Sequence, residues 1–130
     1  MRADSDRLAL LVERARQAPP LSAAEKSEAH LVSGCLAKLW LTGACVDGLC
    51  QFRCDSESLV VKAIAHTLCE LHSGVTPAEV LASTLIDLAP LGVTQHLTPN
   101  RRNALSRVME RLHEQARRFL APPAAPHAAL

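Results

Sequence analysis

The stretch KLWLTGACVDGLCQFRCD, residues 38–55, decides the fold. Apolar and polar side chains alternate along it with the period of two that is typical of a β-strand. Asp47-Gly48, near its centre, is a common two-residue turn of a β-hairpin. The sequence therefore predicts two antiparallel strands, Trp40–Val46 and Leu49–Cys54, joined at this turn.

The predicted turn also fixes the pairing of the strands, with Val46 opposite Leu49 and Cys45 opposite Cys50. One face of the sheet would then carry the mostly apolar set Cys35, Ala37, Leu39, Leu41, Gly43, Cys45, Cys50, Phe52 and Cys54. The other face would carry the mostly polar set Lys38, Trp40, Thr42, Gln51, Arg53 and Asp55. Because only one face is apolar, we expect an α+β fold: a small antiparallel sheet with helices packed on one face.

Helical patterns lie on both sides of the hairpin. Apolar residues at helical spacing predict a helix over residues 6–18, which Pro19-Pro20 would stop. After the hairpin, an N-cap at Asp55 or Ser56 would begin a helix that ends at Ser73-Gly74.

Two further helices are predicted in the second half of the chain. Thr76, Pro77 and Glu79 form a capping box with proline at the first helical position, typical of a short helix that ends near Ser83. Thr98-Pro99 would begin the last and longest helix, whose apolar residues share one face.

Length and composition indicate one small domain. We expect residues 1–120 to form it and the Pro/Ala-rich residues 121–130 to be a disordered tail. The formal net charge is only +1, and Trp40, Phe52 and Phe119 are the only aromatic residues, so the composition does not favour a nucleic-acid-binding protein. No apolar run reaches the length of a signal sequence or membrane span, so we expect a cytoplasmic protein.

The chain has five cysteines, an odd number that argues against a fully paired set of disulfides. In the cytoplasm these thiols would stay reduced. Cys45, Cys50 and Cys54 fit best as small core residues. Cys69 lies between His66 and His72 at helical spacing, but this pattern lacks the spacing of a zinc site, so we expect the three to lie on the helix surface and predict no metal site.

Cys35 is the strongest candidate for chemistry. It follows Ser33-Gly34 and would open the first strand, where a thiol can be exposed and still be held by a rigid sheet. A nucleophilic cysteine needs partial exposure and nearby positive charge. A small buried residue remains the alternative from position alone. Arg101 and Arg102 lie in the first turn of the last helix, where the helix dipole disfavours cations, and such exceptions often mark functional sites.

Taken together, these segments resemble the SufE/CsdE family of sulfur-acceptor proteins, which partner cysteine desulfurases in iron–sulfur cluster assembly. The resemblance covers about residues 30 to 120. The residues that carry it are Val32-Ser33-Gly34-Cys35, Lys38-Leu39-Trp40, Phe52-Arg53, Asp55-Ser56, Leu71-His72-Ser73-Gly74, Thr76-Pro77, Gln95-His96-Leu97-Thr98-Pro99-Asn100-Arg101, Asn103 and Leu105.

The resemblance implies that Cys35 accepts sulfane sulfur from a cysteine desulfurase, carries it as a persulfide and passes it to a scaffold for iron–sulfur clusters. It implies further roles for Asp55, near the cysteine loop, and for Arg101. The partner-binding surface would comprise Gly34, His96, Arg101, Arg102 and Asn103. No cofactor is expected on this chain, because pyridoxal phosphate belongs to the desulfurase, and the chain would be a carrier and activator rather than a stand-alone enzyme.

One departure from the family pattern affects this expectation. Leu36-Ala37 stand where the family usually has Gln-Ser, which removes polar support for the thiolate. We therefore expect the reactivity of Cys35 to depend more on the partner's surface than on its own loop. Two alternatives stay open: an iron–sulfur or zinc scaffold that uses Cys35 with Cys54 or another thiol, and a docking module that activates a desulfurase without accepting sulfur.

Overall fold

The computed structural model describes residues 2–35, 37–84 and 98–121. Its elements in chain order are helix α1 (Arg2–Gln17), the short 3-10 helix η1 (Glu28–His30), strands β1 (Leu39–Val46) and β2 (Leu49–Ser56), and helices α2 (Leu59–Leu71), α3 (Pro77–Ala82) and α4 (Pro99–Leu120). His96 and nearly all of the predicted tail lie outside the described residues.

The predicted hairpin and its register are confirmed. Strands β1 and β2 are antiparallel, Val46 pairs with Leu49, and Cys45 pairs with Cys50. Asp47 and Gly48 both have positive φ angles, 54° and 80°, as the expected two-residue turn requires.

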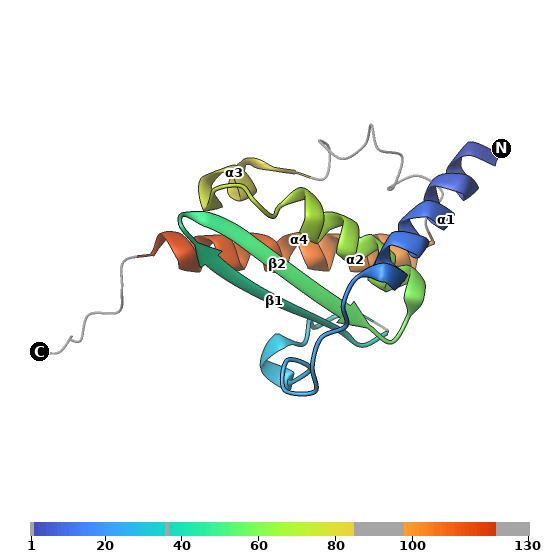
Figure 1. Cartoon of the computed structure of the whole chain (residues 1–130), viewed down its shortest axis with the longest axis horizontal. Helices are drawn as coiled ribbons and strands as arrows, with labels where there is room; N and C mark the ends of the chain where they lie inside the picture. Colours follow the sequence, from blue (N-terminus) through green and yellow to red (C-terminus); the bar gives the residue numbers. More distant parts are fainter. Residues whose placement is uncertain (1, 36, 85–97, 122–130) are drawn as a thin grey trace, which may run out of the picture.

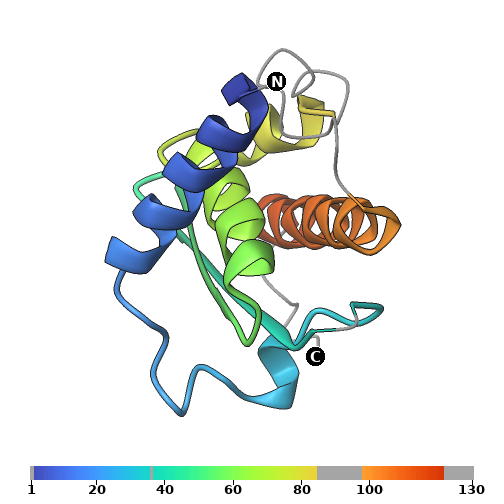
Figure 2. The ribbon, with the colours of Figure 1, turned by 90° about the vertical axis from the view of Figure 1, so that its right-hand side faces the viewer.

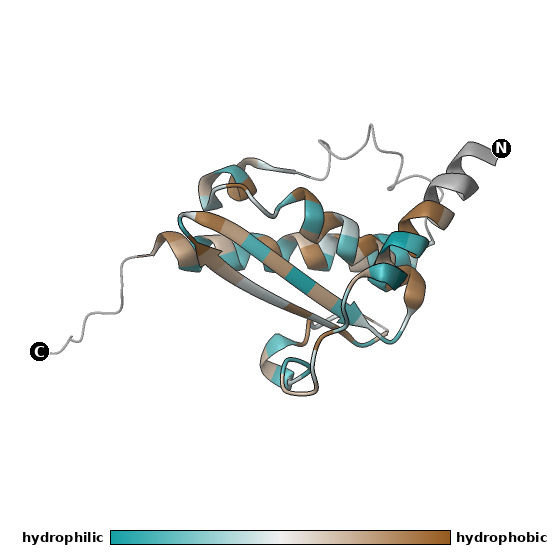
Figure 3. Ribbon diagram, viewed as in Figure 1, coloured by the Kyte–Doolittle hydropathy of each residue, from teal (hydrophilic) through white to brown (hydrophobic). Residues whose placement is uncertain are grey.

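Helices cover one face of this sheet, so the predicted α+β fold is confirmed. Helix α2 contacts β2, helix α4 contacts β1, and the two helices also contact each other. Helix α1 packs on α2, and α3 packs on α4, as Figures 1 and 2 show. Hydrophobic and hydrophilic residues alternate along the hairpin (Figure 3). The largest fully buried side chains are Leu39, Leu41, Leu68, Leu112, Val80, Val108, Cys50 and Cys69.

The predicted starts of α3 and α4 are confirmed. The Thr76 side chain accepts a hydrogen bond from the Glu79 N–H, and the Glu79 carboxylate accepts one from the Thr76 N–H. Thr98 caps α4 in a similar way, by accepting from the Arg101 N–H. These caps satisfy amide groups that a helix leaves without internal partners.

The predicted N-cap of α2 is wrong. Strand β2 continues through Asp55 and Ser56, and the cap is Ser58, whose hydroxyl accepts from the Val61 N–H. The reason is that Trp40 pairs with Asp55 and Leu39 with Ser56, which extends the ladder past the predicted end of the strand.

The expectation that three cysteines are core residues holds for Cys50 and Cys54 but not for Cys45, which is exposed. Cys50 belongs to the hydrophobic core, and its backbone is also paired: its N–H donates to the Val75 carbonyl and its carbonyl accepts from the Gly74 N–H, both at 2.7 Å. Cys69, expected on the surface of its helix, is buried instead, because that side of α2 faces β2.

His72, also expected on the helix surface, is buried as well. Its ring nitrogens lie 2.7 Å from the Leu68 carbonyl and 2.9 Å from the Ser83 hydroxyl.

Among the described helices, none is both long enough and apolar enough to cross a membrane.

Candidate functional site

The sequence had suggested that Cys35 opens a strand. In the structure it lies in a loop instead. Strand β1 begins only at Leu39, and we call residues 33–38 the cysteine loop. The Val32 N–H donates to the Leu39 carbonyl at 2.8 Å, and Leu31 forms an isolated antiparallel bridge with Trp40. The base of the loop is therefore closed on the hairpin, and we call Gly34 and Cys35, which lie beyond this closure, its tip.

Gly34 gives the loop its shape. Its φ angle is +89°, in a region that side chains other than glycine rarely adopt. A Cβ atom at this position would lie only 2.6 Å from Nε of Arg107. Any larger residue at this position would therefore strain the backbone and displace the arginine.

Three side chains of α4 face the loop and the segment before it. Asn103 Nδ2 donates to the Gly34 carbonyl at 2.7 Å. Arg107 lies against Gly34, and Arg111 donates to the Leu31 and Ala29 carbonyls at 3.1 and 2.7 Å. Because these three residues are spaced four apart, they share one face of the helix. The helix thus holds the loop at its base and at its tip.

Replacing Asn103 with alanine is expected to loosen the tip of the loop. A single hydrogen bond of this kind contributes about 0.5–1.5 kcal/mol, so amide hydrogen exchange in residues 33–38 should accelerate about three- to tenfold. Mass-spectrometric hydrogen exchange measures this directly. Asn100→Ala, an exposed residue of the same helix, is the matched control and should leave the loop unchanged. Equal exchange in both variants would contradict the role of Asn103.

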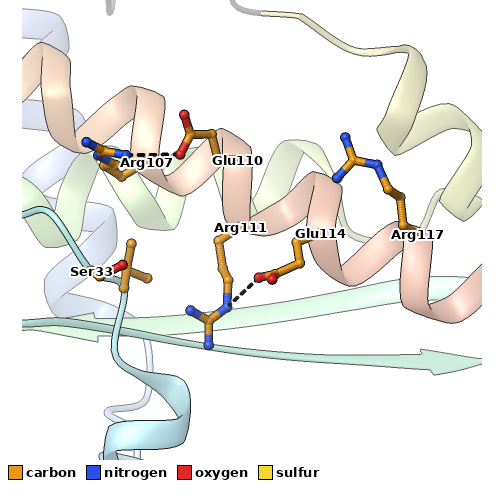
Figure 4. Close-up of a pocket in the computed structure, with 7 residues that line it drawn as sticks. Ser33, Arg107, Glu110, Arg111, Glu114 and Arg117 are labelled. Carbon is orange, nitrogen blue, oxygen red and sulfur yellow. Dashed lines mark hydrogen bonds and ion pairs between the residues drawn. The ribbon is translucent and has the colours of Figure 1, made fainter.

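A charged groove runs along α4 beside the cysteine loop (Figure 4). Its volume is about 350 Å³, and its lining residues are Val32, Ser33, Arg107, Glu110, Arg111, Glu114 and Arg117. Arg107 pairs with Glu110 at 3.3 Å, and Arg111 Nε lies 3.7 Å from Glu114. The ion pairs hold both guanidinium groups along the side of the helix that meets the loop.

The Cys35 thiol is half-buried at this site. Burial raises its pKa, and the positive charge of Arg107 lowers it but does not outweigh the burial, so the pKa stays above that of a free thiol. The resting side chain is therefore mostly a protonated thiol at neutral pH. Its proton must leave before the sulfur can act as a nucleophile.

Asp55 is buried at the open end of the hairpin, beneath the segment that links α1 to β1. Its carboxylate accepts from the Leu21 and Ser56 N–H groups at 3.2 and 2.9 Å. The Nζ atoms of Lys26 and Lys62 lie 3.2 and 3.4 Å from its oxygens. Burial raises the pKa of Asp55, but the hydrogen bonds from Lys26, Ser56 and Leu21 and the charge of Lys62 outweigh it, so the pKa is lowered.

Asp55 reaches the cysteine loop only through its neighbours. The Ser56 hydroxyl donates to the Lys38 carbonyl at 2.7 Å, and the Glu57 N–H donates to the same carbonyl at 3.0 Å. Lys38 is the last residue of the loop. Asp55 thus fixes the end of the hairpin from which the loop leaves, and no described interaction places its carboxylate at the thiol.

The other predicted site residues lie near the start of α4. The Arg101 N–H donates to the Thr98 hydroxyl and the Arg102 N–H to the Thr98 carbonyl, so both belong to the first helical turn. Arg101 is partly buried and Arg102 is exposed. The structure therefore brings Gly34, Cys35 and Asn103 together, while the two arginines lie one turn or less before Asn103 along the helix.

Arg107 and Arg111 were not predicted from the sequence. Both appeared as ordinary charges on the polar side of the last helix. Their spacing of four and eight residues from Asn103 was the available signal, since it places all three on one face. Within the described ranges, no three His, Cys, Asp or Glu side chains gather closely enough to hold a metal ion.

A comparison with sequence families identifies the family of the chain. The sequence model of SufE, described as "Fe-S metabolism associated domain", matches residues 1–116. The chain belongs to the SufE family. This SufE-family chain is 24% identical over 116 residues to an uncharacterized SufE-like protein of Rhizobium meliloti, a match that covers 85% of the chain and 83% of that protein. A second uncharacterized SufE-like protein, from Synechocystis, is 27% identical over 100 residues, covering 77% of the chain and 63% of its own length.

Two further relatives extend the comparison. The chain is 38% identical over 89 residues to the chloroplastic quinolinate synthase of rice; the match covers 68% of this chain and only 12% of that much longer protein. Among solved structures, a hypothetical protein from Thermus thermophilus superposes with a TM-score of 0.73 at 25% identity, covering 89% of this chain and 85% of that one. Membership of the family associates the chain with iron–sulfur metabolism.

Proposed function

We propose that this SufE-family protein is a sulfur acceptor and activator for a cysteine desulfurase of the SufS/CsdA type, and that it carries sulfane sulfur as a persulfide on Cys35. The observation that supports this most strongly is the placement of Cys35, half-exposed in a loop whose base is closed on the hairpin and whose tip is held by Asn103. A thiol in this position is accessible to a partner protein and is held in one place.

The proposed step is an exchange of sulfur between two cysteines. The Cys35 thiolate attacks the terminal sulfur of a persulfide on the desulfurase; a sulfur–sulfur bond forms at Cys35 while the one on the partner breaks, and the partner's thiolate leaves. One sulfur atom moves, the total charge is conserved and no external oxidant or reductant is needed. The carbon–sulfur cleavage that generates the persulfide belongs to the desulfurase and its pyridoxal phosphate.

Because the pKa of Cys35 is raised, its proton must be removed before sulfur transfer. Because the resting thiol is mostly protonated, sulfur uptake must increase as the pH rises toward that pKa, or as the desulfurase supplies a base when it docks. We propose that Gly34, His96, Arg101, Arg102 and Asn103 contribute to the docking surface. We place the reaction in the cytoplasm, where free thiols stay reduced, and propose a scaffold for iron–sulfur clusters as the next sulfur acceptor.

Intact-mass spectrometry tests the proposal. The protein is incubated with a cysteine desulfurase, pyridoxal phosphate and L-cysteine, and the product is digested to locate the added mass. We expect a gain of one sulfur atom on Cys35 that a reductant removes. The exposed Cys45 is the internal reference and should stay unmodified. No gain at Cys35, or equal gain on all five cysteines, would refute the carrier role.

A further inference from the structure

The residue pair Gly34 and Arg107 suggests a role that extends the proposed function, on which it rests. The Cβ position of Gly34 lies 2.6 Å from Nε, 3.1 Å from Cζ and 3.2 Å from Cδ of Arg107. The guanidinium group therefore packs directly on the backbone of the residue before Cys35. Only a glycine leaves this space, so the contact depends on the same residue that gives the loop its shape.

Further contacts keep the arginine and the loop side by side. Glu110 pairs with Arg107 Nη1 at 3.3 Å from the next turn of α4. One turn before Arg107, Asn103 holds the Gly34 carbonyl, so loop and helix cannot easily separate. The groove beside the loop opens onto the same guanidinium (Figure 4).

We propose that Arg107 is the charge partner of Cys35: its guanidinium stabilises the negative sulfur, first as the thiolate that attacks and then as the persulfide anion that is carried. Arg107 acts on the sulfur through its charge, and its contact with Gly34 keeps it beside the loop. A planar guanidinium keeps its charge at every physiological pH and is weakly hydrated, so it suits a soft sulfur anion beside a partly buried loop. It also compensates for the polar residues that Leu36-Ala37 do not provide.

The electrostatics of the thiol agree with this geometry. Arg107 is the charged side chain that lowers the pKa of Cys35 against the effect of burial. A persulfide would extend the Cys35 side chain by one sulfur atom, and Arg107 also lines the groove beside the loop.

Alkylation of Cys35 as a function of pH tests the proposal without any desulfurase. Replacing Arg107 with glutamine should move the titration of Cys35 to higher pH and slow its reaction with iodoacetamide at pH 7 by about three- to tenfold. Peptide mass spectrometry resolves the site, and Cys45 in the same protein serves as the reference thiol. Arg118→Gln is the matched control, since Arg118 lies on the same helix, is exposed and pairs with Glu114 instead.

Two further variants separate charge from shape. Arg107→Lys keeps the charge and should restore most of the alkylation rate. Gly34→Ala displaces the guanidinium. It should therefore slow alkylation more when Arg107 is present than when Arg107 has been replaced with glutamine. The proposal is overturned if Arg107→Gln alkylates like the parent protein, or if Arg107→Lys is as slow as Arg107→Gln. Sulfur uptake from the desulfurase is measured in parallel. If the carrier role is wrong, the parent protein takes up no sulfur; if the role of Arg107 is wrong, the alkylation rates of the Arg107 variants do not change.

Discussion

Replacing Cys35 with serine is expected to abolish sulfur uptake and to remove the stimulation of the desulfurase. A serine hydroxyl does not ionise near neutral pH and cannot form a persulfide, so transfer should fall by about a hundredfold or more, to the background of the assay. The loop should keep its shape, because the contacts that hold it use the Gly34 and Leu39 carbonyls and the Val32 N–H and not the thiol. Sulfide release by the desulfurase and transfer of labelled sulfur measure the two effects.

The matched control for this variant is Cys45→Ser, which changes an exposed thiol on β1 and should retain the transfer of the parent protein. A Cys35→Ser protein that still stimulates desulfurase turnover fully would show that docking alone activates the enzyme. In that case the carrier role would be wrong, and the chain would act as a docking module.

Replacing Asp55 with asparagine is expected to destabilise the fold more than most single substitutions. Asp55 is only 5% exposed, and its carboxylate accepts from two backbone amides. Lys62, whose side chain is only 12% exposed, would keep its charge without its partner. Breaking a mostly buried ion pair of this kind costs about 2–4 kcal/mol. Urea unfolding measures the loss, with Glu57→Gln as the exposed control, which should change stability by less than about 0.5 kcal/mol.

The pH dependence of stability provides a second readout of Asp55. Its pKa is lower in the folded state than in the unfolded chain, so the unfolded chain takes up a proton first as the pH falls. The stabilisation from Asp55 is therefore complete above about pH 4, the ordinary aspartate range, and is lost as the pH falls through the lowered folded pKa. The Asp55→Asn protein should show a flatter stability profile over this acidic range. An unchanged slope would show that the carboxylate is not held as described.

The sequence was sufficient for the regular parts of this fold. Asp47-Gly48 specified the hairpin and its register because a two-residue turn leaves little freedom to the strands. Thr76 and Thr98 predicted the helix starts, because a capping hydroxyl has a local and recognisable task.

Long-range contacts limited the rest. Residues 55–58 contain three possible helix caps, and Asp55 was predicted as one of them. Only the pairing of Asp55 with Trp40 shows that it belongs to the strand. Its burial depends on the irregular segment around Leu21 and Lys26, which has no periodicity from which a position could be predicted. Cys35 was predicted to lie on a strand because the period of two was extended from Leu39 back to Cys35. The positive φ angle of Gly34 bends the chain out of the strand direction before Cys35. Arg107 acquires its significance only when α4 lies beside the loop.

The hydrogen bond between the Val32 N–H and the Leu39 carbonyl limits how far the sulfur can travel. Cys35 lies only three positions after Val32, so even a fully extended loop would carry this residue about 10 Å from the end of the hairpin. On the proposed function, such a tether is too short to shuttle cargo between two distant enzymes. The donor and the recipient of the sulfur must instead bind beside the cysteine loop one after the other, and the first must dissociate before the second binds.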